Sequence, residues 1–207
     1  MKKELKPGDM LAPLPVIMAS VSNGKEDNII TIAWTGIINS EPPMTYISVR
    51  PSRHSHQMLK ASREFVINIP NRDLVFATDY CGCKTGAKED KFENMHLTKE
   101  KASVVSCPMI KECPINLECR VTQIIELPTH DMFLAEIVKV HAREDLIDGK
   151  NMFHPEWAHL IAFHHGKYFG VPRTALLRIG ESVMKPSTEK RIANERKAKR
   201  REARRNG

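Results

Sequence analysis

Residues 28–56 read NIITIAWTGIINSEPPMTYISVRPSRHSH, and this stretch decides the fold. Its β-branched and apolar residues at 29–34 and 45–50 follow the period of two that is typical of strands. The EPP triplet at 41–43 breaks the chain between them, because proline cannot donate a ladder hydrogen bond. Pro51 then forces an extended turn, and helix-forming residues follow it. The stretch therefore predicts a strand, a loop, a second strand and a basic turn that opens a helix.

The rest of the chain continues the strand pattern. Besides Ile29–Trp34 and Thr45–Arg50, the candidate strands are Pro15–Val21, Phe65–Ile69, Leu117–Glu126 and Met132–His141. A turn at Asn23-Gly24 predicts a hairpin, and a second hairpin is expected around His165-Gly166. Short helices are expected at Ser52–Ser62, Asp73–Tyr80 and Glu89–Met95. Many short strands and few helices predict a mainly β fold, a barrel with helical insertions.

The length of 207 residues fits one domain, which we assign to residues 1–184, followed by a basic tail at 185–207. The tail holds ten of the 32 Lys and Arg residues and three of the 25 Asp and Glu residues. The remaining 22 basic and 22 acidic residues balance, so the domain has no electrostatic reason to bind nucleic acid. We therefore expect no nucleic-acid partner except through the tail. The tail has no apolar stripe, so we expect it to be a frayed helix or disordered.

Five cysteines in a chain of this size do not form a disulfide framework, and free thiols are the expectation. No apolar run approaches the roughly 20 residues of a membrane-spanning helix. Acidic residues and prolines interrupt the apolar N-terminal segment, which argues against a signal peptide. We therefore expect a cytoplasmic protein that does not enter a membrane.

The segment SVRPSRHS at 48–55 is the first candidate site. The N–H groups and dipole of an opening helix attract an anion, and Arg50, Arg53, Ser52 and Ser55 add donors beside them. This chemistry fits a phosphate monoester. The plainer alternative is that Ser52 caps the helix and that the arginines are only solvated.

Two further segments could contact a ligand. Small residues around Trp34 leave room for a planar heterocycle, although Trp34 could equally belong to the core. The segment CGCKTGAKEDKF at 81–92 predicts a loop that can approach a ligand and that carries three lysines. One Cys-x-Cys pair without a second cluster is a weak metal signal, so no metal site is predicted. No side chain stands out as an acid, base or nucleophile, which favours a cofactor that performs the chemistry itself.

Taken in order, these segments resemble the flavin reductase-like, FMN-binding split-barrel family, which includes the flavoredoxins. The matching features are NIxTxAW at 28–34, Pro-Pro at 42–43, SVRPSRHS at 48–55, EFVINIP at 64–70, and Thr85-Gly86 followed by DKF at 90–92. Each motif is short, but their order and spacing match over about residues 12–170. The cysteines at 81 and 83 stand where the family resemblance leads us to expect other small residues.

The resemblance implies an FMN-binding split β-barrel with Greek-key connections. By position, Thr31, Ala33, Trp34 and Thr35 would line the isoalloxazine ring. Ser48, Val49 and Arg50 would lie along the ribityl chain, and Arg53, Ser55 and Lys91 would hold the phosphate. Thr85, Gly86 and Phe92 would close the pocket.

The resemblance further implies an FMN-dependent oxidoreductase in which NAD(P)H gives a hydride to flavin N5. Electrons would then pass to a flavin, a metal or a redox partner protein. It also implies a homodimer with FMN near the subunit interface. The alternative is an FMN-holding electron carrier or sensor without NAD(P)H activity, and a third is a polyanion-binding protein that works through its tail.

Overall fold

The computed structural model describes residues 1–184. The basic tail predicted at 185–207 lies outside the described residues. The chain divides into two compact units, Met1–Arg173 and Thr174–Gly207. The first unit carries every strand that the structure describes, and it ends before the domain boundary expected at residue 184. The described part of the second unit holds one 3₁₀ turn, Glu181–Val183.

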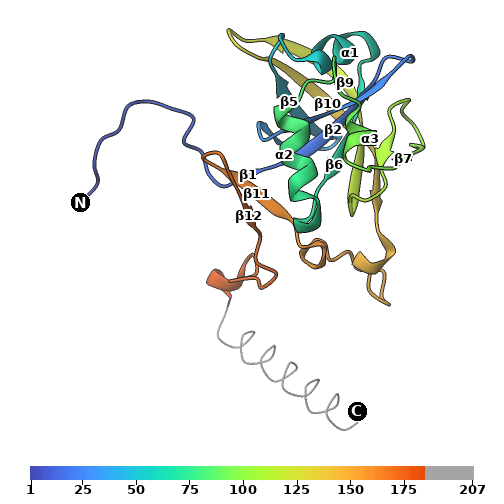
Figure 1. The fold of residues 1–207 in the computed structure, drawn as a ribbon. Coiled ribbons are helices and arrows are strands. Elements are labelled where there is room, and N and C mark those ends of the chain that lie inside the picture. The colour runs from blue at the N-terminus through green and yellow to red at the C-terminus, as the bar shows by residue number, and fades with distance from the viewer. Residues whose placement is uncertain (185–207) are drawn as a thin grey trace. The chain divides into compact units, whose positions relative to one another are not determined.

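The first unit is built on a seven-stranded sheet with the order β3-β2-β6-β9-β10-β5-β4 (Figure 1). All its neighbouring strands are antiparallel. The strands are β2 (Ile17–Ser22), β3 (Asp27–Ile32), β4 (Thr35–Ser40), β5 (Pro43–Val49), β6 (Glu64–Ile69), β9 (Ile115–Glu126) and β10 (Asp131–Ala142). This architecture confirms the mainly β class expected from the sequence.

Two small sheets complete the unit. The first is three-stranded, in the order β1-β11-β12, with bounds Leu14–Pro15, Ile161–His164 and Lys167–Gly170. The predicted hairpin at His165-Gly166 is its β11–β12 turn, where both residues have positive φ. The second pairs β7 (Lys99–Glu100) with β8 (Met109–Ile110).

Three short helices pack on this framework: α1 (His54–Ser62), α2 (Val75–Cys83) and α3 (Lys91–Asn94). A 3₁₀ turn at Arg72–Leu74 precedes α2, and the Asn71 side chain caps that turn by accepting from the N–H of Asp73. Two further 3₁₀ turns, Glu144–Leu146 and Pro155–Ala158, follow β10. No helix in residues 1–184 is long and apolar enough to cross a membrane.

Strand β2 is buried along its whole length because both of its faces are covered. One face meets the barrel core, where Ala19 and Val21 pack with Phe65 and Phe133. The other face meets α2 and α3, where Met18 packs with neighbours that include Ala77, Cys81 and Phe92. This double burial explains why IMASVS lacks the strict alternation of a strand with one solvated face.

The structure corrects two local predictions. The expected loop after Trp34 is strand β4, an edge strand that pairs only with β5 and bulges between Ile37 and Asn39. Its last four residues are all exposed, so no alternation marked it as a strand. The expected Cys81–Cys83 loop is the last turn of α2, where Lys84 closes the helix by donating to the carbonyl of Tyr80. Helix α2 therefore extends past the predicted end at Tyr80.

Candidate functional site

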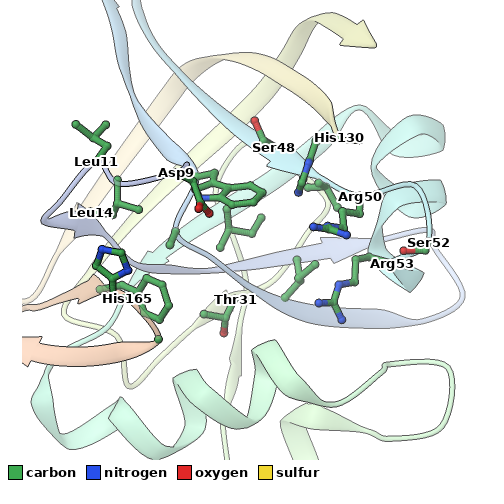
Figure 2. Close-up of a pocket in the computed structure, with 17 residues that line it drawn as sticks. Asp9, Leu11, Leu14, Thr31, Ser48, Arg50, Ser52, Arg53, His130 and His165 are labelled. Atoms are coloured by element: carbon green, nitrogen blue, oxygen red, sulfur yellow. The ribbon is translucent and has the colours of Figure 1, made fainter. Parts of the chain in front are cut away.

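A cavity of about 630 Å³ opens between the large sheet and the three-stranded sheet. Its volume lies within the range of small-molecule and cofactor sites. Strand β3, the end of β5 and the turns that follow these two strands form one side of the cavity. The N-terminal segment and the β11–β12 hairpin form the other side. Figure 2 shows Arg50 and Arg53 at one end and Leu14 and His165 at the other. The cavity is therefore cationic at one end and more apolar at the other.

Trp34 lies in the bend that joins β3 to β4 and is half-buried. Its ring meets that of His130 edge-on, with 4.4 Å between the ring centroids. The backbone is held there by a hydrogen bond of 3.0 Å from the Ser48 N–H to the Trp34 carbonyl. The bend therefore places an aromatic face along the cavity wall, as a planar ligand would need.

Thr31 lies on the floor of the cavity near α2. Its hydroxyl donates to the carbonyl of Thr78, and a Cβ added to Gly82 would lie 3.2 Å from the Thr31 Cβ. The glycine in the last turn of α2 thus allows the helix to approach the strand closely. This contact fixes the depth of the cavity beneath Thr31.

The turn between β5 and α1 carries the positive charge of the site. Its backbone is closed by a bond of 3.0 Å from the Arg53 N–H to the Arg50 carbonyl. Arg53 is the extended residue that precedes α1, and no side chain caps the start of this helix. Ser52 is therefore not the helix cap that the sequence analysis gave as the alternative to a phosphate site. Neither arginine forms an ion pair with any carboxylate among residues 1–184. An uncapped helix start beside two unneutralised guanidinium groups favours an anion.

A second cavity of about 120 Å³ shares Ile30, Ser52 and Arg53 with the first. The Asn28 side chain donates to the Ser55 hydroxyl there, across 2.8 Å. A Cβ on Gly86 would lie only 2.3 Å from Asn28 Oδ1, so any side chain at that position would displace the Asn28 amide. Asn28, Ser55 and Gly86 therefore form a tight polar cradle at the cationic end of the main cavity.

Lys91 enters this second cavity from α3 and is 4% exposed. Its Nζ donates to the carbonyls of Ile29 and Cys81, at 2.7 and 2.8 Å. The pKa of Lys91 is lowered to about 8, chiefly by burial and with a smaller effect of the Arg53 charge, against the opposing effect of Cys81. An ammonium has three hydrogens, so these two bonds leave one for a ligand.

The structure brings most of the predicted site residues to the two cavities. Thr31, Ala33, Trp34, Ser48, Val49, Arg50 and Arg53 line the first, and Arg53, Ser55, Thr85, Gly86 and Lys91 line the second. Thr35 and Phe92 line neither. The Thr35 hydroxyl donates to the Tyr46 carbonyl at 2.6 Å, and Phe92 packs in the core beneath α3. These two residues lie behind the walls that the others form.

Several lining residues were not predicted. They include Asp9, Leu11, Leu14, His130 and Phe163. His130 precedes β10, and burial together with the nearby Arg50 lowers its pKa. The His165-Gly166 turn was the one sequence signal on this side of the cavity, and it indicated a hairpin rather than a site. The described residues contain no group of three or more potential metal ligands.

The comparisons with known proteins agree with this geometry. Residues 10–172 match the flavin reductase-like domain family, and the chain belongs to that family. The resemblance noted in the sequence is thereby confirmed.

Solved structures extend the match to the fold. The flavoredoxin of Desulfovibrio vulgaris (Miyazaki F) is 27% identical with a TM-score of 0.83, over 89% of this chain and 100% of that one. A flavoredoxin from Methanosarcina acetivorans is also 27% identical, with a TM-score of 0.77, over 88% of this chain and 100% of that one. An uncharacterised protein of Archaeoglobus fulgidus is 35% identical over 130 residues, which are 63% of this chain and 73% of that protein. The fold is the split barrel of this family, as the sequence predicted.

Proposed function

We propose that the protein is an FMN-binding oxidoreductase of the flavin reductase and flavoredoxin type. The observation that carries this proposal is the pairing of the two cavities. A long cavity with an aromatic wall leads to a small polar cradle beside two arginines that have no carboxylate partner in residues 1–184. FMN has matching parts, a planar ring joined through a polar chain to a dianionic phosphate.

The residues present fit this cofactor. Arg53, Ser55 and Lys91 would hold the phosphate, with Thr85 and Gly86 closing the cradle. The absence of a side chain on Gly86 keeps Asn28 and its bond to Ser55 in place, so the hydroxyl stays fixed before a ligand arrives. Because the cradle is already formed, little ordering cost falls on binding.

The main cavity would take the rest of the cofactor. Ser48, Val49 and Arg50 would lie along the ribityl chain, and Thr31, Ala33 and Trp34 would face the ring. Thr35 and Phe92 would support these walls from behind, since neither reaches a cavity. When bound, FMN would supply the hydride-transfer and electron-transfer chemistry of the reaction.

We propose that NAD(P)H is the electron donor and that a flavin, a metal or a partner protein is the acceptor. The family description supports reductase chemistry. The chain's own contribution would be to bind and orient the cofactor, and His130 is available at the cavity wall to exchange a proton with the bound ligands. We also propose a homodimer; Ile37 on edge strand β4 is 70% exposed and would suit such a contact.

The test is a titration followed by a reduction assay. Purified protein stripped of any bound chromophore is titrated with FMN, and the loaded protein is then mixed with NADH or NADPH without oxygen. Saturable binding and bleaching of the flavin band support the proposal. If dithionite bleaches the band and neither nicotinamide cofactor does, the protein is an electron carrier instead. If FMN does not bind, the proposed function is wrong.

A further inference from the structure

A buried histidine and aspartate pair lies behind the wall of the main cavity. His56 Nε2 on α1 lies 2.7 Å from the carboxylate oxygen Oδ2 of Asp131, the first residue of β10. His56 is 2% exposed and Asp131 is 4% exposed. Neither residue lines either cavity of the flavin site. The pair is therefore shielded from solvent and from any ligand in the site.

This pair is a poor device for stability alone. Within residues 1–184, His56 Nδ1 is the one buried side-chain nitrogen or oxygen that lacks a hydrogen-bond partner. The ring packs against Phe133 instead, with 5.6 Å between the ring centroids and an angle of 77° between the ring planes. Well-packed apolar residues often stabilise a core as well as a buried ion pair does, and they leave no nitrogen unsatisfied. The presence of His56 in the core therefore points to a role besides stability.

Asp131 ties helix α1 to the start of β10. The sheet pairs Asp131 with Val49 on β5 and with Glu126 on β9. Lys60, one turn after His56 on α1, has its Nζ 3.3 Å from Asp131 Oδ2 and 3.0 Å from Glu126 Oε1. Although burial opposes this, the bonds from His56 and Lys60 hold the pKa of Asp131 below its usual range. The carboxylate therefore stays charged and keeps both contacts with the helix.

The residue before Asp131 reaches the main cavity. His130 ends the turn between β9 and β10, where its carbonyl accepts from the N–H of Leu127 at 3.0 Å. Its ring lines the cavity and meets the ring of Trp34. The Thr129 hydroxyl lies 2.9 Å from His130 Nδ1. Because His130 and Asp131 are adjacent in the chain, an anchor on Asp131 limits how far His130 can move from Trp34.

We propose that His56 and Asp131 are positioning residues, which hold His130 in place beside the bound flavin ring. Helix α1 makes this anchor part of the phosphate site, because Ser55, the residue before His56, lines the phosphate cradle. One short helix therefore sets the position of both the cradle and His130. This inference rests on the proposed function, in which His130 contacts the ligands of the main cavity.

The first experiment needs no flavin and follows the fluorescence of Trp34 in the stripped full chain. A Trp157→Phe background removes the other tryptophan, which stacks on a histidine of its own. An imidazolium quenches an indole that it touches, so the fluorescence should fall as His130 gains its proton between about pH 8 and 5. His56→Leu should largely abolish this fall. His56→Gln should retain it, because the glutamine amide can still donate to Asp131.

His141→Leu is the matched control. His141 also pairs with a buried carboxylate, that of Glu118 at 2.6 Å, but it lines neither cavity, so its loss should leave the fluorescence change intact. The second experiment measures reduction of bound FMN at saturating NADH. His56→Leu should lower this rate constant about tenfold, since misplacing a positioned group by about 1 Å can cost up to about 100-fold. The Kd for FMN should change less than about twofold, because no contact with FMN is removed.

Fluorescence that still falls in His56→Leu as it does in the background variant would overturn the inference. The absence of any fall in the background variant would also overturn it, because His130 would then not contact Trp34. A His56→Leu protein that unfolds, or whose melting temperature, FMN affinity and reduction rate fall together, would show that the pair serves stability instead. Protein that binds no FMN contradicts the proposed function, and the fluorescence of the flavin-free chain still decides whether His56 positions His130.

Discussion

Replacing Arg53 by alanine should separate the two parts of the flavin site. Arg53 lines both the main cavity and the phosphate cradle, and it has no carboxylate partner among the described residues. Its guanidinium is therefore available to a phosphate. Riboflavin has the same ring and ribityl chain as FMN but no phosphate, so it reports on the rest of the site.

The size of the effect follows from the exposure of Arg53. A hydrogen bond to a charged group contributes about 1.5–3 kcal/mol. Arg53 is exposed, so solvent screening favours the lower end of that range. About 1.5 kcal/mol corresponds to about a 13-fold weaker Kd for FMN. Riboflavin binding should change less than about twofold, because no phosphate contact is lost.

The assay is quenching of flavin fluorescence by wild-type protein, Arg53→Ala and the control Arg72→Ala. Arg72 is an exposed arginine in the turn before α2 and lines neither cavity of the flavin site. The control should bind both flavins as the wild type does. Equal losses for FMN and riboflavin in Arg53→Ala would refute the phosphate role, as would no loss for either.

Four further predictions follow from the described contacts. Gly86→Ala would place a Cβ against the Asn28 amide, so both the melting temperature and the FMN affinity should fall, measured by thermal unfolding and by titration. Burial lowers the pKa of Lys91 to about 8, so FMN affinity should decline from about pH 7 to 9 as the ammonium loses its proton, while riboflavin affinity does not. The carboxylate of Glu118 accepts from three backbone N–H groups and pairs with a histidine; despite burial, these bonds hold its pKa near 2. Its contribution to the free energy of unfolding should therefore be lost as pH falls from about 4.5 to 2, and Glu118→Gln should flatten that dependence in denaturant titrations. Among the five cysteines only Cys83 is exposed, so a thiol reagent should modify one equivalent in native protein and five after unfolding, as counted by mass spectrometry.

Much of the fold was predictable because its signals are local. The β-branched alternation, the Asn23-Gly24 turn and the prolines at 42–43 marked strands and turns that the structure contains. Strand β4 was missed because an exposed edge strand has no buried face to impose alternation. The end of α2 was missed because glycine lowers helix propensity. In the structure Gly82 belongs to the helix, because a residue without a side chain lets α2 pack closely against Thr31.

The site was predictable only where its residues are close in sequence to a motif. The segments at 31–34 and 48–55 carry enough of a pattern to mark one wall of the cavity. His130 lies just before β10 and Phe163 lies on β11, and only the pairing of these strands with distant parts of the chain brings both residues to the same cavity. The environment of Lys91 was equally hidden, because its acceptors at Ile29 and Cys81 are backbone carbonyls, which every residue has.

The most direct test of the central claim is the absorbance spectrum of the purified full chain, before and after titration with FMN. The cavity and its phosphate cradle predict a flavin band at saturation with one FMN per chain, and release of the phosphorylated flavin on heating. A colourless protein that also fails to bind added FMN would contradict the claim.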